Sequence, residues 1–155
     1  MKTKLIVFLL AILGSFCTFA GDWADDISPQ TALKAIQLFR DDPVSEDALA
    51  AVAIVLNFAE RSDDVLVLID AKYLPFELGA IESDANSKFL GAYVAGNVEY
   101  QLLNSVRENR PMEGIRFMLQ TYEKFRQADA IEVQSGFEEW LELERKGQLG
   151  DAFET

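Results

Sequence analysis

The chain contains no histidine among its 155 residues, and its one cysteine, Cys17, lies near the amino end. Without histidine, Ser-His-Asp and Cys-His catalysis, histidine general bases and nearly every zinc or transition-metal site are excluded. A single cysteine excludes a disulfide within the chain, so packing alone must hold the fold. The enzyme classes that remain must rely on carboxylates.

Sequence patterns for binding phosphate and calcium are also missing. The nine glycines are scattered, and none forms a glycine-rich loop ahead of a helix. The acidic stretches at residues 22–26 and 41–47 lack the alternating ligands, central glycine and terminal glutamate of an EF-hand loop. We therefore expect no metal and no cofactor.

Basic residues are few, with 14 lysines and arginines against 26 acidic residues and a formal net charge of −12. A surface of this charge repels nucleic acid and anionic lipid head groups, and it attracts basic partners and cations. The charge also helps to keep an exported protein soluble. We expect no nucleic-acid partner, and a basic protein is favoured over an acidic one.

What the sequence does contain begins with an export signal. Lys2 and Lys4 precede nine unbroken apolar residues at positions 5–13, and small and polar residues then lead to Ala20. This order is typical of a secretory signal peptide cleaved after Ala20. The sixteen residues at positions 5–20 are shorter than the ~20 that span a bilayer. We predict a signal peptide at 1–20 and a single helical domain at 21–155, periplasmic or extracellular, with no membrane contact after cleavage.

Helix-start signals recur along the predicted mature chain. Ser28 precedes Pro29, Ser45 precedes acidic residues, Pro111 opens an amphipathic run, and Ser135 forms a capping-box pattern with Glu138. Gly147 is a typical helix stop. The pattern predicts an all-α fold, a compact bundle of five main helices plus one or two short helices. No fixed-period repeat indicates a solenoid, and we expect a monomer or a small oligomer.

Two segments determine the expected layout of this bundle. Residues 48–58 are apolar on nearly every side, which predicts a helix in the middle of the core. Residues 65–69, Val-Leu-Val-Leu-Ile, fit either a buried strand or a helix that starts after Ser62. Because no second strand pattern is present, we predict a short helix there.

The stretch FLGAYVAGNVEYQLL, residues 89–103, predicts a helix despite two internal glycines, each of which costs ~1 kcal/mol relative to alanine. Small side chains would let a neighbouring helix, most plausibly residues 48–58, approach closely. The predicted helix-contact residues are Gly91, Ala92, Ala95 and Gly96. The polar residues of the second half follow a separate stripe, which we expect to reach solvent: Asn97, Gln101, Asn104 and Glu108.

The layout of the second half, from FLGAYVAG through PMEGIRFMLQTYEKF to a final amphipathic helix, resembles small exported helical immunity proteins that neutralise cell-wall-degrading toxins. Those proteins usually carry a disulfide, which this chain lacks, and the likeness covers only the second half. The resemblance implies a role in inhibiting another protein, and it does not assign the chain to that family.

The sequence favours a non-catalytic exported module that binds another protein as an adaptor, inhibitor or immunity-like protein. The candidate partner-binding residues are Trp23, Trp140 and Phe153. One alternative is a carrier that holds a small apolar ligand between helices, in a pocket lined by Tyr93, Asn97 and Tyr100. A second alternative is a carboxylate-dependent hydrolase, although most acidic residues lie at helix starts, where capping and the helix dipole explain them. We name no catalytic residue.

Overall fold

The structure is a computed structural model, and it describes residues 27–76 and 84–153. Five α-helices make up most of this part: α1 (Pro29–Asp41), α2 (Asp47–Arg61), α3 (Asp84–Asn104), α4 (Pro111–Gln127) and α5 (Ser135–Arg145). Two 3₁₀ helices, Ala71–Tyr73 and Asp151–Phe153, are the short elements. The described residues contain no strand, so the predicted all-α bundle is confirmed.

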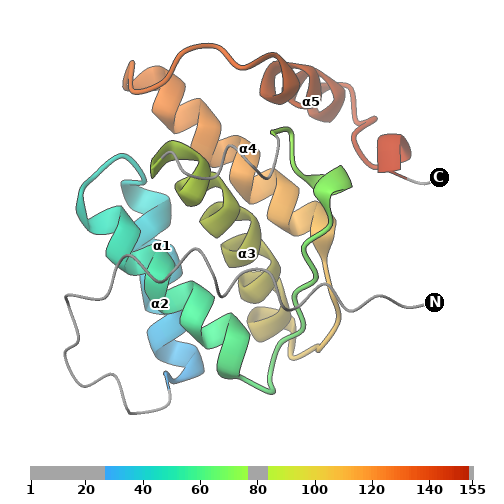
Figure 1. Cartoon of the computed structure of the whole chain (residues 1–155). Coiled ribbons are helices and arrows are strands. Elements are labelled where there is room, and N and C mark those ends of the chain that lie inside the picture. Colours follow the sequence, from blue (N-terminus) through green and yellow to red (C-terminus); the bar gives the residue numbers. More distant parts are fainter. Residues whose placement is uncertain (1–26, 77–83, 154–155) are drawn as a thin grey trace.

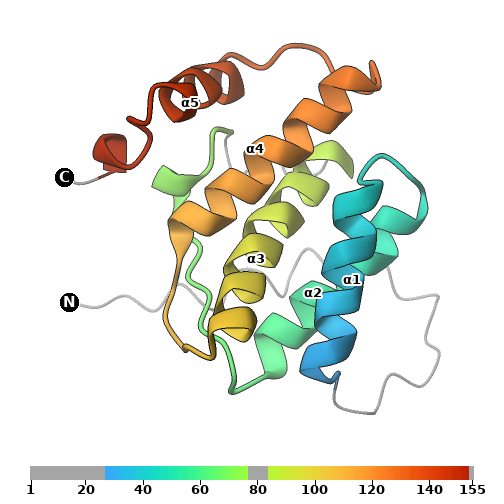
Figure 2. The same cartoon turned by 180° about the vertical axis from the view of Figure 1, so that it is seen from behind.

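Helix α3 lies in the middle of the bundle, between α4 on one side and the α1–α2 pair on the other (Figures 1 and 2). It is buried on every side over residues 88–98. The expectation that residues 48–58 form the central helix is wrong: α2 buries one face, which includes Val52, Val55 and Phe58, and it exposes Ala50 and Ala53. Alanine offers little apolar area, so a helix rich in alanine can face water on one side at small cost.

Two of the predicted helix starts are correct, and two need correction. Ser28 caps α1, because its hydroxyl accepts a hydrogen bond from the Thr31 amide at 3.1 Å, and Pro111 is the first residue of α4. Ser45 does not cap α2; its hydroxyl donates to the Asp42 carbonyl at 2.9 Å, and the helix begins two residues later. Ser135 is the first residue of α5 and makes no capping bond.

The start of α5 is stabilised from another helix. The Tyr122 hydroxyl of α4 accepts a hydrogen bond from the Gln134 amide at 3.0 Å and donates to the Glu138 carboxylate at 2.8 Å. Glu138 is therefore engaged by a tyrosine rather than by a capping box. At the other end of α5, Gly147 ends the helix with a φ of 68°, which favours glycine.

Glycines set the contact between α3 and α4. A methyl group built on Gly96 would lie 2.4 Å from the Glu113 carbonyl oxygen, and one built on Gly114 would lie 2.5 Å from the Tyr93 carbonyl oxygen. Each helix thus presents a glycine to the backbone of the other. The neighbour of Gly96 is α4, not α2 as expected. Gly91 does face α2, where a methyl group would lie 2.4 Å from Cγ1 of Val52.

Ala92 and Ala95 lie between these glycines on α3, and both are buried. An aromatic group continues the core toward α5, with the Phe137 ring 4.4 Å from Tyr122 and 4.7 Å from Phe89 between centroids. The core therefore runs without a break from α1 to α5.

Candidate functional site

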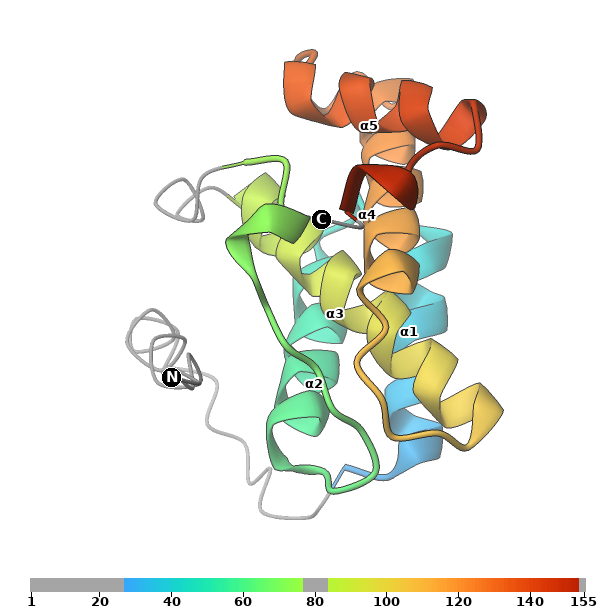
Figure 3. The same cartoon turned by 90° about the vertical axis from the view of Figure 1, so that its right-hand side faces the viewer.

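Residues 65–70 form no helix, so the predicted short helix at residues 65–69 is wrong. The chain runs as an extended stretch there in Figure 3, and Asp70 at its end has extended backbone angles. Val65 is buried and Val67 and Ile69 are half-buried, whereas Leu66 and Leu68 are 38% and 47% exposed. This alternation with a period of two is typical of a strand with one buried face, and β-branched residues favour it. The 3₁₀ helix begins only at Ala71. We call residues 65–70 the extended segment.

Side chains of α3 and of the loop after it hold the inner edge of the extended segment. The Gln101 amide pairs with both backbone groups of Leu66: its Oε1 accepts from the Leu66 N–H at 2.8 Å, and its Nε2 donates to the Leu66 carbonyl at 3.0 Å. The Leu68 N–H donates to Oδ1 of Asn109 at 2.9 Å, and the Tyr93 hydroxyl donates to the Leu68 carbonyl at 3.0 Å. We call Tyr93, Gln101 and Asn109 the clamp, which takes the place of a neighbouring strand.

Asn97 lies behind the clamp and is 0% exposed, so the expectation that it reaches solvent is wrong. Its Nδ2 donates to Oδ1 of Asn109 at 2.9 Å. Its Oδ1 accepts from Nε2 of Gln101 at 2.7 Å and from the Arg110 amide at 3.0 Å. Asn97 thereby fixes the orientation of two clamp amides, and buried polar networks of this kind hold a single arrangement.

The predicted polar stripe of α3 therefore divides into two parts. Asn97 and Gln101 are buried beneath the extended segment and the loop that follows α3, whereas Asn104 and Glu108 are exposed as expected. Gln101 and Asn109 hold the extended segment although the sequence pattern did not indicate it. The alternation at residues 65–69 was the available signal for an extended segment, but the spacing of Asn97 and Gln101 is that of a stripe facing water.

The three residues of the carrier hypothesis do not line an open space. Tyr93 is fully buried with its hydroxyl bonded to Leu68, and the polar atoms of Asn97 are bonded to other parts of the chain. Tyr100 is half-buried beneath the Arg110 guanidinium, 5.2 Å from its ring centre. Burial, with smaller contributions from Tyr73 and Asp70, raises the pKa of Tyr93 well above 10.0. This tyrosine is a structural donor rather than a binding group.

Two of the three predicted partner-binding residues are in contact. The Trp140 and Phe153 ring centres lie 5.1 Å apart, and Tyr73 lies 5.4 Å from Phe153. All three side chains are half-buried. We call them the aromatic cluster. Trp23 lies outside the described residues.

The aromatic cluster and the extended segment share one side of the molecule. Figure 3 looks onto this side, where the extended segment leads into the 3₁₀ helix Ala71–Tyr73 and the carboxyl-terminal 3₁₀ helix Asp151–Phe153 lies nearby. A close approach of α5 supports the arrangement, because a methyl group on Gly136 would lie 2.5 Å from the Pro75 carbonyl oxygen. We call this side, with the extended segment and the aromatic cluster, the binding face.

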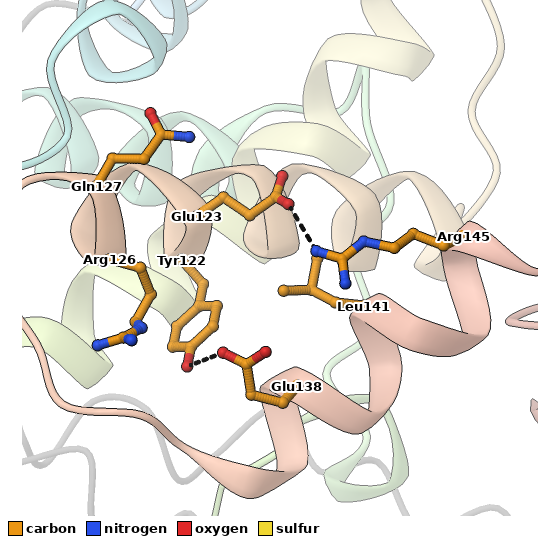
Figure 4. Close-up of a pocket in the computed structure, with 7 residues that line it drawn as sticks. All are labelled: Tyr122, Glu123, Arg126, Gln127, Glu138, Leu141 and Arg145. Carbon is orange, nitrogen blue, oxygen red and sulfur yellow. Dashed lines mark hydrogen bonds and ion pairs between the residues drawn. The ribbon is translucent and has the colours of Figure 1, made fainter.

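A shallow crevice of about 200 Å³ lies between α4 and α5 (Figure 4). Its two carboxylates are already engaged: Glu138 accepts from the Tyr122 hydroxyl at 2.8 Å, and Glu123 faces Arg145 at 3.5 Å. Burial raises the pKa of Tyr122, and its bond to Glu138 adds to the increase. The crevice is open and charged, so it offers no acid in an apolar setting of the kind that a glycoside hydrolase uses.

Within the two described ranges, no group of three acidic, histidine or cysteine side chains could hold a metal ion, and no helix is long and apolar enough to cross a membrane. Comparison of the chain with protein-family models, with curated proteins and with solved structures finds no match. No matching relative therefore accompanies the likeness of layout to immunity proteins.

Proposed function

We propose that this protein is a non-catalytic exported module that binds another protein through the binding face. The observation that carries the proposal is the extended segment. Leu66 and Leu68 are two of the few large apolar side chains exposed in the described residues, and a buried network of amides and a tyrosine holds their backbone in place. A loop with no role outside the fold would not need this support, because loops tolerate change and motion.

The composition of the binding face agrees with this proposal. Exposed leucines beside half-buried aromatic rings, with polar residues around them, are the usual elements of a protein interface. The negative charge of the chain favours a basic partner, as an adaptor, inhibitor or immunity-like protein would meet. Export follows from the signal at residues 1–20 and is part of the same proposal.

Site-specific photocrosslinking tests the proposal. The photoreactive residue p-benzoylphenylalanine is placed at position 68, and in a matched variant it replaces Leu38, an exposed leucine of α1. Helix α1 lies behind α3 in the view of Figure 3. We expect irradiation of the exported fraction to join position 68, but not position 38, to one protein of defined mass. Equal labelling at both positions would place the partner elsewhere, and no adduct at either position would contradict the proposed function.

A further inference from the structure

We propose that the partner binds by strand addition: an extended peptide segment, with apolar residues in its centre and basic residues at both ends, pairs with the outer edge of the extended segment. This inference rests on the proposed function and specifies the mode of binding. Strand addition is an established way in which an exposed edge recognises a peptide.

The backbone of the extended segment has one occupied edge and one open edge. Leu66 and Leu68 direct their N–H and carbonyl groups toward the clamp. In an extended chain successive residues direct these groups to opposite sides, so those of Val67 and Ile69 point away from the clamp. Both residues are half-buried, and neither makes a backbone hydrogen bond to another described part of the chain, whereas Val65 is buried. Among the described residues, the outer edge at Val67 and Ile69 is therefore unpaired.

The side chains define which partner strand fits this edge. Leu66 and Leu68 project from the side of the extended segment that is not packed on the core, as their exposure shows. A partner strand in register would place its alternate residues beside them, and apolar or β-branched side chains there would cover the two leucines. The partner segment therefore carries apolar residues at every second position.

Charge decides the ends of the partner strand. Asp63 and Asp64 precede the extended segment and Asp70 ends it; all three are exposed, and no ion pair to any of them is present in the described part of the chain. The nearby Lys72 ammonium lies over the Tyr73 ring, 4.8 Å from its centre. Lysine or arginine at both ends of a partner strand would meet these carboxylates.

The same charges disfavour a second copy of this chain as the occupant. In an antiparallel pair of two copies, Asp63 and Asp64 of one would lie near Asp70 of the other, and like charges opposite each other destabilise a strand pair. In a parallel pair, each aspartate would face its own counterpart. A basic partner segment avoids both conflicts.

Selection from a random peptide library displayed on phage, with the purified protein as bait, tests the mode of binding. We expect enriched peptides to alternate apolar residues and to carry lysine or arginine at both ends. N-methylation of a selected synthetic peptide should abolish binding at alternate positions only, because only every second amide faces the edge. Leu68→Asp in the protein removes an apolar side chain that the partner would cover and should weaken binding at least about tenfold, and Leu38→Asp should leave binding unchanged.

The outcomes separate this inference from the proposed function. Enriched peptides that are acidic or helical, a lack of enrichment, or N-methylation effects without a period of two would overturn strand addition. If the photocrosslink at position 68 still forms in that case, the binding face stands and only the mode is wrong. If neither the crosslink nor any selected peptide depends on position 68, both proposals fall.

Discussion

Helix α3 contacts its neighbours in two different ways. Gly91 faces α2 and Gly96 faces α4 on another side of the helix, and at both positions the neighbour comes so close that no side chain would fit between them. Elsewhere on the same helix, Tyr93 and Gln101, together with Asn109 of the following loop, hold a piece of extended chain through hydrogen bonds. The glycine contacts stabilise through close packing and the hydrogen-bonded contact through satisfied polar groups. The comparison shows that a helix buried all round need not be apolar all round.

Disrupting a glycine contact should give the largest change in stability. Gly96→Leu should lower the free energy of unfolding by ~3 kcal/mol or more, because the new side chain meets the Glu113 backbone, which cannot move aside as a flexible side chain would. Leucine is the better helix former, so propensity alone predicts the opposite sign. Chemical denaturation measures the change. Gly150→Ala, where a methyl group would meet no atom within 4 Å, is the control, and an equal loss in both variants would contradict the close-packing account.

Removing Asn97, which orients the clamp amides, should give the next largest change in stability. Asn97→Ala leaves the Arg110 amide without its acceptor and removes one hydrogen bond each from the Gln101 and Asn109 side chains, and we expect a loss of ~2 to 3 kcal/mol. Asn104 is the matched control, because it is exposed and bonds only to the Tyr100 carbonyl of its own helix. Asn104→Ala should change stability by less than ~0.5 kcal/mol. Similar denaturation midpoints for the two variants would contradict the claim that buried Asn97 stabilises the fold more than exposed Asn104 does.

A smaller change removes one hydroxyl of the clamp. Tyr93→Phe leaves the Leu68 carbonyl without its donor, and we expect a loss of ~1 kcal/mol near neutral pH. Burial raises the pKa of Tyr93 in the folded state, so the unfolded chain releases this proton first, near pH 10.0. The stabilisation linked to this proton is present below pH 10 and is lost as the pH rises above it. Denaturation between pH 9 and pH 11 should therefore show a shallower decline for Tyr93→Phe, and parallel curves would contradict this linkage.

The smallest change in stability is expected just after the carboxyl end of α3. Ser105 follows α3 with a φ of 52°, a conformation that suits glycine better than serine. Ser105→Gly should raise the free energy of unfolding by ~0.5 to 1 kcal/mol, measured by thermal or chemical denaturation. Asp129 follows α4 with the same φ, and Asp129→Gly should gain less because aspartate adopts this conformation more readily. A loss of stability in Ser105→Gly would show that its side chain has a role that the structure does not reveal.

The glycine contacts and the hydrogen-bonded contact also differ in how far the sequence predicts them. A glycine inside a helix violates propensity, so Gly91 and Gly96 indicate close contact even without a structure, although Gly96 meets α4 rather than the expected helix. The proline starts at Pro29 and Pro111 and the stop at Gly147 depend on local geometry, and they too can be read from the sequence.

The buried amides could not be identified in this way. Asn97 and Gln101 have the same spacing as a stripe that faces water, and only the position of residues 65–70 shows that they are covered. The extended segment in turn lacks a second strand in the sequence, because its partner is a row of side chains. Ser45 and Ser135 failed as caps for a related reason: other groups satisfied the helix starts or the serine itself.

Amide hydrogen exchange within residues 65–70, followed by NMR, tests the central claim most directly. If the clamp holds the inner edge and leaves the outer edge free, the amides of Leu66 and Leu68 should be protected, and those of Val67 and Ile69 should exchange rapidly. Asn97→Ala should remove the protection of Leu66 and Leu68 and change the fast pair little. Uniform protection across the segment would mean that the outer edge is already paired, and uniform rapid exchange would mean that the clamp does not hold; either result would contradict the account.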